Sequence, residues 1–294
     1  MSVYSAKDFD SRNYNDNRPT YPDEFYEILM DYHQGPRSLA IDVGCGPGTA
    51  TFHLASEIKS IDCIIGTDAS STMIDTARQL QNAQKVGNLS FEVSPCEKFE
   101  FLGPERTNSH SCDLITAAEC AHWFNFEDFQ DSAWKNMRRD GTIAVWGYSD
   151  ALFVNYPDLD DMMNGITYNS DKLGPYWQQP GRNILRGMYS ERKLDPTKFK
   201  DIQDVSLHVS DYRTGNIDTL NPRPLKVCKK QTIIQYANYI KSWSAYHSWK
   251  KDQENEDSDI VDDWVHKVLQ VHPELAHEPQ LIAWNTFYKF GRRL

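Results

Sequence analysis

The sequence predicts an α/β fold, in which a doubly wound, mostly parallel sheet carries helices on both faces. Short apolar runs alternate with helical patterns between residues 39 and 148, and this alternation is typical of parallel sheets. A glycine-rich turn directly follows the first apolar run, and an acidic residue, Asp68, ends the second. Because ligands bind at the carboxyl ends of the strands in such sheets, these features predict a ligand site at that edge.

The elements of the first half follow from their hydrophobic spacing. Phe25 and Ile28 lie on one face of an expected helix that follows a polar, aromatic-rich arm. Asn125 is expected to cap a later helix, which Asp140-Gly141 would end. Strands are expected at residues 39–43, 63–68, 89–93, 113–117 and 142–148, and helices at 23–33, at 50–58, after Ser70 and after Asn125.

The alternation stops after Tyr148. Residues 149–200 are rich in Pro, Gly, Tyr and Asp, and Thr232 begins an amphipathic helix that runs towards Trp249. A strand at 202–209, a helix at 259–271 and a last strand at 281–290 are also expected. We therefore predict a single domain over residues 1–294, made of an arm (1–22), a ligand-binding core (23–148), insertions with a helical cover (149–280) and the last strand (281–294).

Pro19 and Pro22 disfavour helix at the end of the arm. The arm is then either a disordered leader or a segment that docks over the site. Its tyrosines and Arg18 favour docking.

Composition narrows the class of protein. The 294 residues carry a net charge of −11, which argues against nucleic-acid binding because phosphate recognition needs a basic face. No apolar stretch is long enough for a membrane span, and the N-terminus lacks a signal-peptide core. The six cysteines are scattered without a C-x-x-C pair, so we expect a cytoplasmic protein with reduced thiols and no metal site.

The glycine turn distinguishes two classes of cofactor. Dinucleotide sites use G-x-G-x-x-G, whereas here the third glycine, Gly48, comes one position early and Thr49 follows it. Asp42 precedes the first glycine, Gly44, and this carboxylate would repel a pyrophosphate but attract an amino group and a sulfonium. The pattern favours S-adenosylmethionine, and a nicotinamide-dependent dehydrogenase is the remote alternative.

With Asp68 and Cys96-Glu97 in register, the chain resembles the class I S-adenosylmethionine-dependent methyltransferases. The resemblance implies a seven-stranded sheet with the glycine loop under the methionine part of the cofactor. It also implies that Asp68 binds the ribose, that Cys96-Glu97 lies beside the adenine, and that Ala118-Glu119 follows the cofactor's other side. S-adenosylhomocysteine would be the product.

Longer motifs, from the arm to the C-terminus, are similar to those of the fungal trans-aconitate 3-methyltransferases. They are Arg18-Pro19-Thr20-Tyr21-Pro22, Glu119-Cys120-Ala121-His122-Trp123-Phe124, Leu173-Gly174-Pro175-Tyr176-Trp177, Trp243-Ser244-Ala245-Tyr246 and Trp284-Asn285-Thr286-Phe287-Tyr288. This resemblance implies that a small di- or tricarboxylic acid, such as trans-aconitate or an isopropylmalate-like acid, is converted to its monomethyl ester.

A carboxylic acid with a pKa near ~4 is already ionised at neutral pH, so no general base is expected. Arginine is the natural partner of the remaining carboxylates, and Arg182 is the first choice, with Arg18 as an alternative that could also bind the cofactor. A plain surface arginine at 182 and a packed structural pair at His122-Trp123 are the competing interpretations. Aromatic side chains near a sulfonium have a cation–π rationale.

The predicted cofactor-binding residues are Tyr14, Arg18, Asp42, Gly44, Gly46, Gly48, Asp68, Ala69, Met73, Cys96, Glu97, Ala118 and Glu119. The predicted substrate-binding residues are His122, Trp123, Tyr148, Trp177, Arg182, Trp243 and Tyr246. Two alternative functions remain open at this point. One is a methyltransferase for another small acceptor, such as a phenol or a carbon acid, with His122 as the base. The other is a non-catalytic binding protein with the methyltransferase fold. The oligomeric state is left open.

Overall fold

The computed structural model describes residues 18–252, 255 and 258–294. Its central sheet has the strand order β3-β2-β1-β4-β5-β8-β6, and β7 pairs with β8 beside this path. The strands are β1 (Leu39–Val43), β2 (Cys63–Asp68), β3 (Leu89–Val93), β4 (Cys112–Ala118), β5 (Met137–Phe153), β6 (Phe199–Leu207), β7 (Cys228–Gln231) and β8 (Gln280–Arg293). The first five strands are parallel and β8 is antiparallel to its neighbours. The predicted doubly wound sheet is confirmed, with β7 as an additional strand beside the path of seven.

Helices cover both faces of the parallel part. The helices of this part are α2 (Asp23–Tyr32), α3 (Thr49–Glu57), α4 (Ser71–Gln84) and α5 (Phe126–Asn136). Phe25, Leu54 and Ile74 of the first three helices belong to one hydrophobic cluster, and Phe129 of α5 belongs to a second cluster. All four helices were expected within a few residues, because each buries an apolar stripe with helical spacing.

Two local expectations at the helix–strand junction are wrong. The side chain of Asn125 does not cap α5 but donates to Asp128 Oδ2. Asp140-Gly141 lies inside β5, where Cys112 pairs with Met137 and Leu114 with residue 142. β5 therefore has extra residues at this point, and its pairing register with β4 shifts. The Asp-Gly pair therefore marks an irregularity within a long strand, and the strand begins before it.

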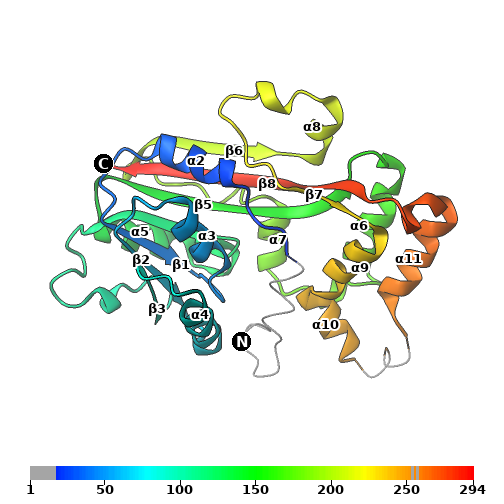
Figure 1. The fold of residues 1–294 in the computed structure, drawn as a ribbon, viewed down its shortest axis with the longest axis horizontal. Coiled ribbons are helices and arrows are strands. Elements are labelled where there is room, and N and C mark those ends of the chain that lie inside the picture. Colours follow the sequence, from blue (N-terminus) through cyan, green and yellow to red (C-terminus); the bar gives the residue numbers. More distant parts are fainter. Residues whose placement is uncertain (1–17, 253–254, 256–257) are drawn as a thin grey trace.

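The strands β5 and β8 extend well beyond the parallel core and carry the helical cover at their far end (Figure 1). The cover contains α6 (Asp160–Tyr168), α7 (Gly181–Arg186), α9 (Ile233–Lys241), α10 (Ser244–Lys250) and α11 (Ile260–Val271), and α8 (Val209–Thr214) follows β6. The helix expected to continue from Thr232 to Trp249 is interrupted, because Trp243 is extended between α9 and α10. The short helices α6 and α7 were not expected, since their polar, Pro- and Gly-rich surroundings weaken the helical pattern.

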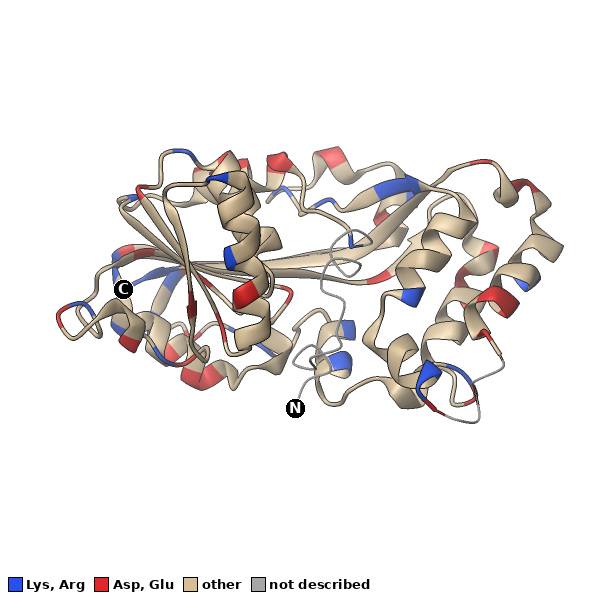
Figure 2. Cartoon of the chain, turned by 60° about the horizontal axis from the view of Figure 1, so that its bottom comes forward, with Lys and Arg blue, Asp and Glu red and all other residues tan. Residues whose placement is uncertain are grey.

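The end of the arm packs against the core. Tyr21 is buried, and its ring centroid lies 5.8 Å from that of Trp146 on β5. Docking is thus observed for residues 18–22, whereas residues 1–17 lie outside the described part. Acidic and basic residues are interspersed over the core and the cover (Figure 2). Within the described residues, none of the helices has the length and apolar character needed to cross a bilayer.

Candidate active site

The glycine loop joins β1 to α3 and is tied to the end of β2. Gly44, Gly46 and Gly48 all have positive φ angles, which glycine adopts without the cost that a Cβ imposes. A Cβ on Gly44 would come within 2.8 Å of the Cys120 sulfur, whereas one on Gly46 would meet nothing within 4 Å. The loop therefore packs tightly on one side and is open on the other.

Asp68 holds this open side in place. Its Oδ2 accepts a hydrogen bond from the Gly46 amide (2.9 Å), and its Oδ1 accepts one from the Ser70 amide (2.8 Å). Burial raises the pKa of the carboxyl group, and both amide bonds oppose that shift. Each carboxylate oxygen can accept a second hydrogen bond, so the two oxygens of Asp68 can still accept hydrogen bonds from two hydroxyl groups of a ligand.

A cavity lies over this loop at the carboxyl ends of the parallel strands, and we call it the glycine-loop cavity. Eight of the predicted cofactor-binding residues line it: Gly44, Gly46, Asp68, Ala69, Met73, Cys96, Glu97 and Glu119. Cys96 and Glu97 are in contact, with the thiol 3.1 Å from Glu97 Oε2.

The other predicted cofactor-binding residues lie elsewhere. The predicted residues that do not line this cavity are Arg18, Asp42, Gly48 and Ala118, and Tyr14 lies outside the described residues. Asp42 is 1% exposed, and its two oxygens accept hydrogen bonds from the hydroxyls of Thr51 and Thr116, both at 2.6 Å. Burial raises its pKa to about 6. Asp42, which belongs to β1, thus links α3 and β4 through hydrogen bonds. It stabilises the glycine loop without lining the cavity.

A second cavity lies between the sheet and the helical cover, and we call it the aromatic cavity. Its lining contains eight residues that the sequence analysis predicted: Arg18, Glu119, His122, Trp123, Tyr148, Trp177, Arg182 and Trp243. Other residues of the lining include Asp150, Met163, Tyr236 and Tyr239. Tyr246 lies outside this lining, because its hydroxyl donates to Asp259 Oδ2 and its ring stacks on Trp249. The two cavities share Glu119 and Trp123, so they adjoin.

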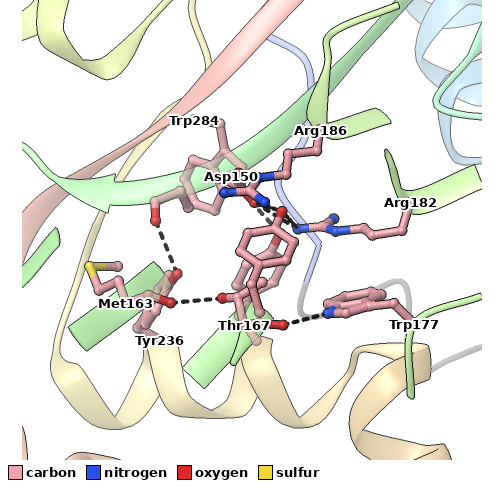
Figure 3. Close-up of polar contacts among 11 residues, drawn as sticks. Asp150, Met163, Thr167, Trp177, Arg182, Arg186, Tyr236 and Trp284 are labelled. Atoms are coloured by element: carbon pink, nitrogen blue, oxygen red, sulfur yellow. Dashed lines mark hydrogen bonds and ion pairs between the residues drawn. The ribbon is translucent and has the colours of Figure 1, made fainter. Parts of the chain in front are cut away.

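Arg182 is the central cation of the aromatic cavity (Figure 3). Its Nη2 donates to Asp150 Oδ1 and to Tyr168 Oη, both at 2.7 Å, and its guanidinium lies 4.1 Å from the Trp177 ring centroid. The side chain is only 11% exposed. Nε is buried without a hydrogen-bond partner among the described residues. An unpaired buried donor is costly, so this group is suited to an anionic ligand.

Glu119 occupies the border between the two cavities. Its Oε2 accepts the Tyr148 amide at 2.7 Å, and a Cβ on Gly147 would come within 2.4 Å of that oxygen. Burial raises the pKa of Glu119 to about 7, although the hydrogen bond and the charges of Arg18 and Arg182 oppose the shift. A carboxyl group here can change charge near neutral pH.

The structure also adds polar residues that the sequence analysis missed. Asp150 and Tyr168 hold Arg182, and Tyr189 contacts His122. Asp150 follows the predicted strand at residues 142–148, and an acidic residue just after a strand is a signal that could have indicated a role in the site. For Tyr189 the sequence offers no signal, since its segment follows a short helix with no clear pattern.

Comparison with known proteins identifies the family. Residues 40–141 match a family model described as a methyltransferase domain. Over 294 residues the chain is 31% identical to the Saccharomyces cerevisiae protein named "Probable S-adenosylmethionine-dependent methyltransferase CRG1", and the match covers 99% of this chain and 98% of the relative. The chain belongs to the class I S-adenosylmethionine-dependent methyltransferases. The predicted family is confirmed, and the dehydrogenase alternative is wrong.

Two further matches bear on this methyltransferase. It is 28% identical over 184 residues to the trans-aconitate 2-methyltransferase of Methylobacterium radiotolerans, covering 62% of each chain. A solved structure described as "The Structure of a Putative Type II Methyltransferase from Anaeromyxobacter dehalogenans" has a TM-score of 0.67 at 20% identity, and the match covers 94% of this chain and 97% of that one. The second match confirms the fold.

S-adenosylmethionine is the cofactor of the methyltransferase family to which the chain belongs. The glycine-loop cavity fits it, because the loop is open at Gly46 and Asp68 keeps acceptor capacity on both oxygens. The roles of the individual residues in holding the cofactor remain predictions, with Asp68 towards the ribose and Cys96-Glu97 towards the adenine.

Proposed function

We propose that the methyltransferase esterifies one carboxylate of a small di- or tricarboxylic acid, such as trans-aconitate. The observation that carries this proposal is Arg182, a buried guanidinium with an unpartnered Nε among the described residues, in a cavity that adjoins the glycine-loop cavity. Arginine suits carboxylates because its planar fork matches their geometry. The name of the Methylobacterium relative points to the same class of acceptor.

Methyl transfer to a carboxylate requires no proton transfer by the protein. When bound, S-adenosylmethionine supplies an electrophilic methyl group, and a carboxylate oxygen forms the new O–C bond as the sulfonium S–C bond breaks. An ionised carboxylate already has the electron pair for that step, so no residue has to remove a proton. The residues of the aromatic cavity would orient the acid and exclude water.

The charges of the cavity indicate how many carboxylates it can hold. Among the described lining residues, Arg18 and Arg182 are cationic, and Asp150 is an acid that faces Arg182. Asp150 and Tyr168 already occupy Nη2, so Nε and Nη1 are the parts of Arg182 that remain for a substrate. We therefore expect one carboxylate to be bound at Arg182 while a second one is methylated.

A methyl-transfer screen tests the proposal. Purified protein is incubated with labelled S-adenosylmethionine and matched mono-, di- and tricarboxylic acids, and the ester position is determined by mass spectrometry and NMR. We expect di- or tricarboxylic acids to be the best acceptors. Methyl transfer to phenols or carbon acids, with no transfer to the carboxylic acids, would instead support a methyltransferase for another small acceptor. Cofactor binding without any transfer would favour a binding protein.

A further inference from the structure

His122 and Tyr189 form a closely paired unit at the wall of the aromatic cavity. His122 lies in the short 3-10 turn η3 (Ala121–Trp123), directly after β4, and Tyr189 follows α7. The backbone N–H of His122 donates to Tyr189 Oη at 3.0 Å, and the same oxygen lies 2.7 Å from His122 Nδ1. Both side chains are buried.

The hydroxyl proton of Tyr189 decides the tautomer of His122. A phenol has one proton to donate, and burial of Tyr189, which is 1% exposed, makes an unused donor costly. In the described part of the chain, Nδ1 of His122 is the acceptor within its reach. Tyr189 therefore accepts from the His122 amide and donates to Nδ1, which leaves the imidazole proton on Nε2.

The charge state of His122 agrees with this arrangement. Burial lowers its pKa to about 3, and the nearby cations Arg182 and Arg18 act in the same direction. The ring is thus neutral at physiological pH. His122 lines the aromatic cavity, and its Nε2 has no hydrogen-bond partner among the residues that the structure describes.

We propose that Tyr189 is a positioning residue that holds His122 as the Nε2–H tautomer, so that His122 donates a hydrogen bond to an acceptor oxygen and cannot take a proton from it. The identity of that oxygen as a carboxylate rests on the proposed function. A neutral donor adds recognition beside Arg182 without adding charge. His122 could not act as a base for an acceptor that must lose a proton at this position. Phenols and carbon acids that need His122 as their base are therefore excluded as acceptors.

The tautomer is tested by ¹⁵N NMR of protein labelled at histidine, with no acceptor present. His122→Gln assigns the His122 resonances, and the spectrum is recorded between pH 5 and pH 8. We expect a neutral Nε2–H ring throughout that range. Tyr189→Phe should introduce the Nδ1–H form or a titration within the range, whereas Tyr26→Phe, which removes a buried hydroxyl without a partner among the described residues, should change nothing. An Nδ1–H ring or an imidazolium in the unmutated protein overturns the proposal.

The donor role is tested by comparing two variants of similar size. Gln can place an N–H near the position of His Nε2, and Met cannot donate. With the best acceptor from the screen, His122→Met should raise KM by about 10- to 100-fold, and His122→Gln should recover a large part of that loss. Cofactor affinity, measured by calorimetry, should stay within about twofold in both, which shows that they fold.

Equal losses in the two variants would show that His122 donates nothing to the acceptor. The NMR experiment needs no acceptor, so it decides the tautomer even where the acid screen fails. A failed screen with an Nε2–H ring would remove the proposed function and leave the role of Tyr189 standing.

Discussion

At the scale of single residues, the site depends on buried charges whose partners are supplied from other elements. Arg182 is held by Asp150 of β5 and Tyr168 of α6. A buried guanidinium is stable only where its donors are largely satisfied. The hydrogen bonds to Asp150 and Tyr168 both involve Nη2, so Nε and Nη1, which have no hydrogen-bond partner among the described residues, mark the place where a ligand can complete the arrangement.

Arg182→Lys should raise the KM for a dicarboxylic acid by about 10- to 100-fold, because lysine keeps the charge but loses the planar fork. The effect should be smaller for a monocarboxylic acid, since that acid has no second carboxylate to bind. Steady-state kinetics with both acids measures the difference. Arg139→Lys, at an exposed arginine of β5 outside the cavity lining, is the control and should leave KM unchanged. Equal changes for both acids would remove Arg182 from the role of holding a second carboxylate.

Glu119 should make stability depend on pH. Its pKa is raised by burial from 4.5 to about 7, so the folded protein keeps a proton that the unfolded chain releases between these values. Stability is therefore lost as the pH rises through this window. At pH 8, Glu119→Gln should be more stable than the unmutated apoprotein by on the order of 1–2 kcal/mol. The gain is limited to this size because the carboxyl group borders a cavity. It should vanish below pH 4.5, where the carboxyl group is protonated in the folded and the unfolded protein. Urea denaturation at pH 8 and pH 4.5 measures it, with the exposed Glu278→Gln as control.

At the scale of elements, capping explains which sequence signals were reliable. Thr232 accepts the Gln235 amide, and Gln235 Oε1 accepts the Thr232 amide in return, so the expected start of α9 is confirmed. Asn125 is an equally good cap by residue type, yet its side chain is directed to Asp128. The difference arises because an exposed Asn has competing local partners.

Thr232→Ala should lower the free energy of unfolding by about 1 kcal/mol, since it removes an N-cap. Because α9 carries Tyr236 and Tyr239 of the aromatic cavity, KM for the acceptor should rise at the same time. Asn125→Ala, where the cap hydrogen bond is absent, should have little effect on stability. Denaturation curves of the two variants, measured together, test the contrast, and equal losses would contradict it.

At the scale of the whole molecule, the core and the cover share two strands. β5 pairs with β4 in the core and with β8 over most of its length, and β7 of the cover end also pairs with β8 (Figure 1). The aromatic cavity lies along β5, where Tyr148, Asp150 and Ala151 line it. We therefore expect the cover to unfold together with the core, as parts of one domain.

Unfolding should accordingly occur in a single transition. Tryptophan fluorescence, which reports strongly on the cover, should give the same midpoint as far-ultraviolet circular dichroism. Saturation with S-adenosylhomocysteine at about 100 times its Kd should raise the free energy of unfolding by about 2.7 kcal/mol for both probes. Separate midpoints, or a shift in only one probe, would show that the cover unfolds on its own.

The sequence by itself determined the parallel core, the glycine loop and the family, because hydrophobic periodicity, glycine turns and an acid at a strand end are local features. It also indicated Arg182, His122 and the aromatic walls. Only the tertiary structure decided what these side chains do. Arg182 meets Asp150 across 32 positions, and His122 meets Tyr189 across 67. Such pairings depend on how β5, α7 and η3 pack together, and no local pattern encodes the direction of a single hydrogen bond.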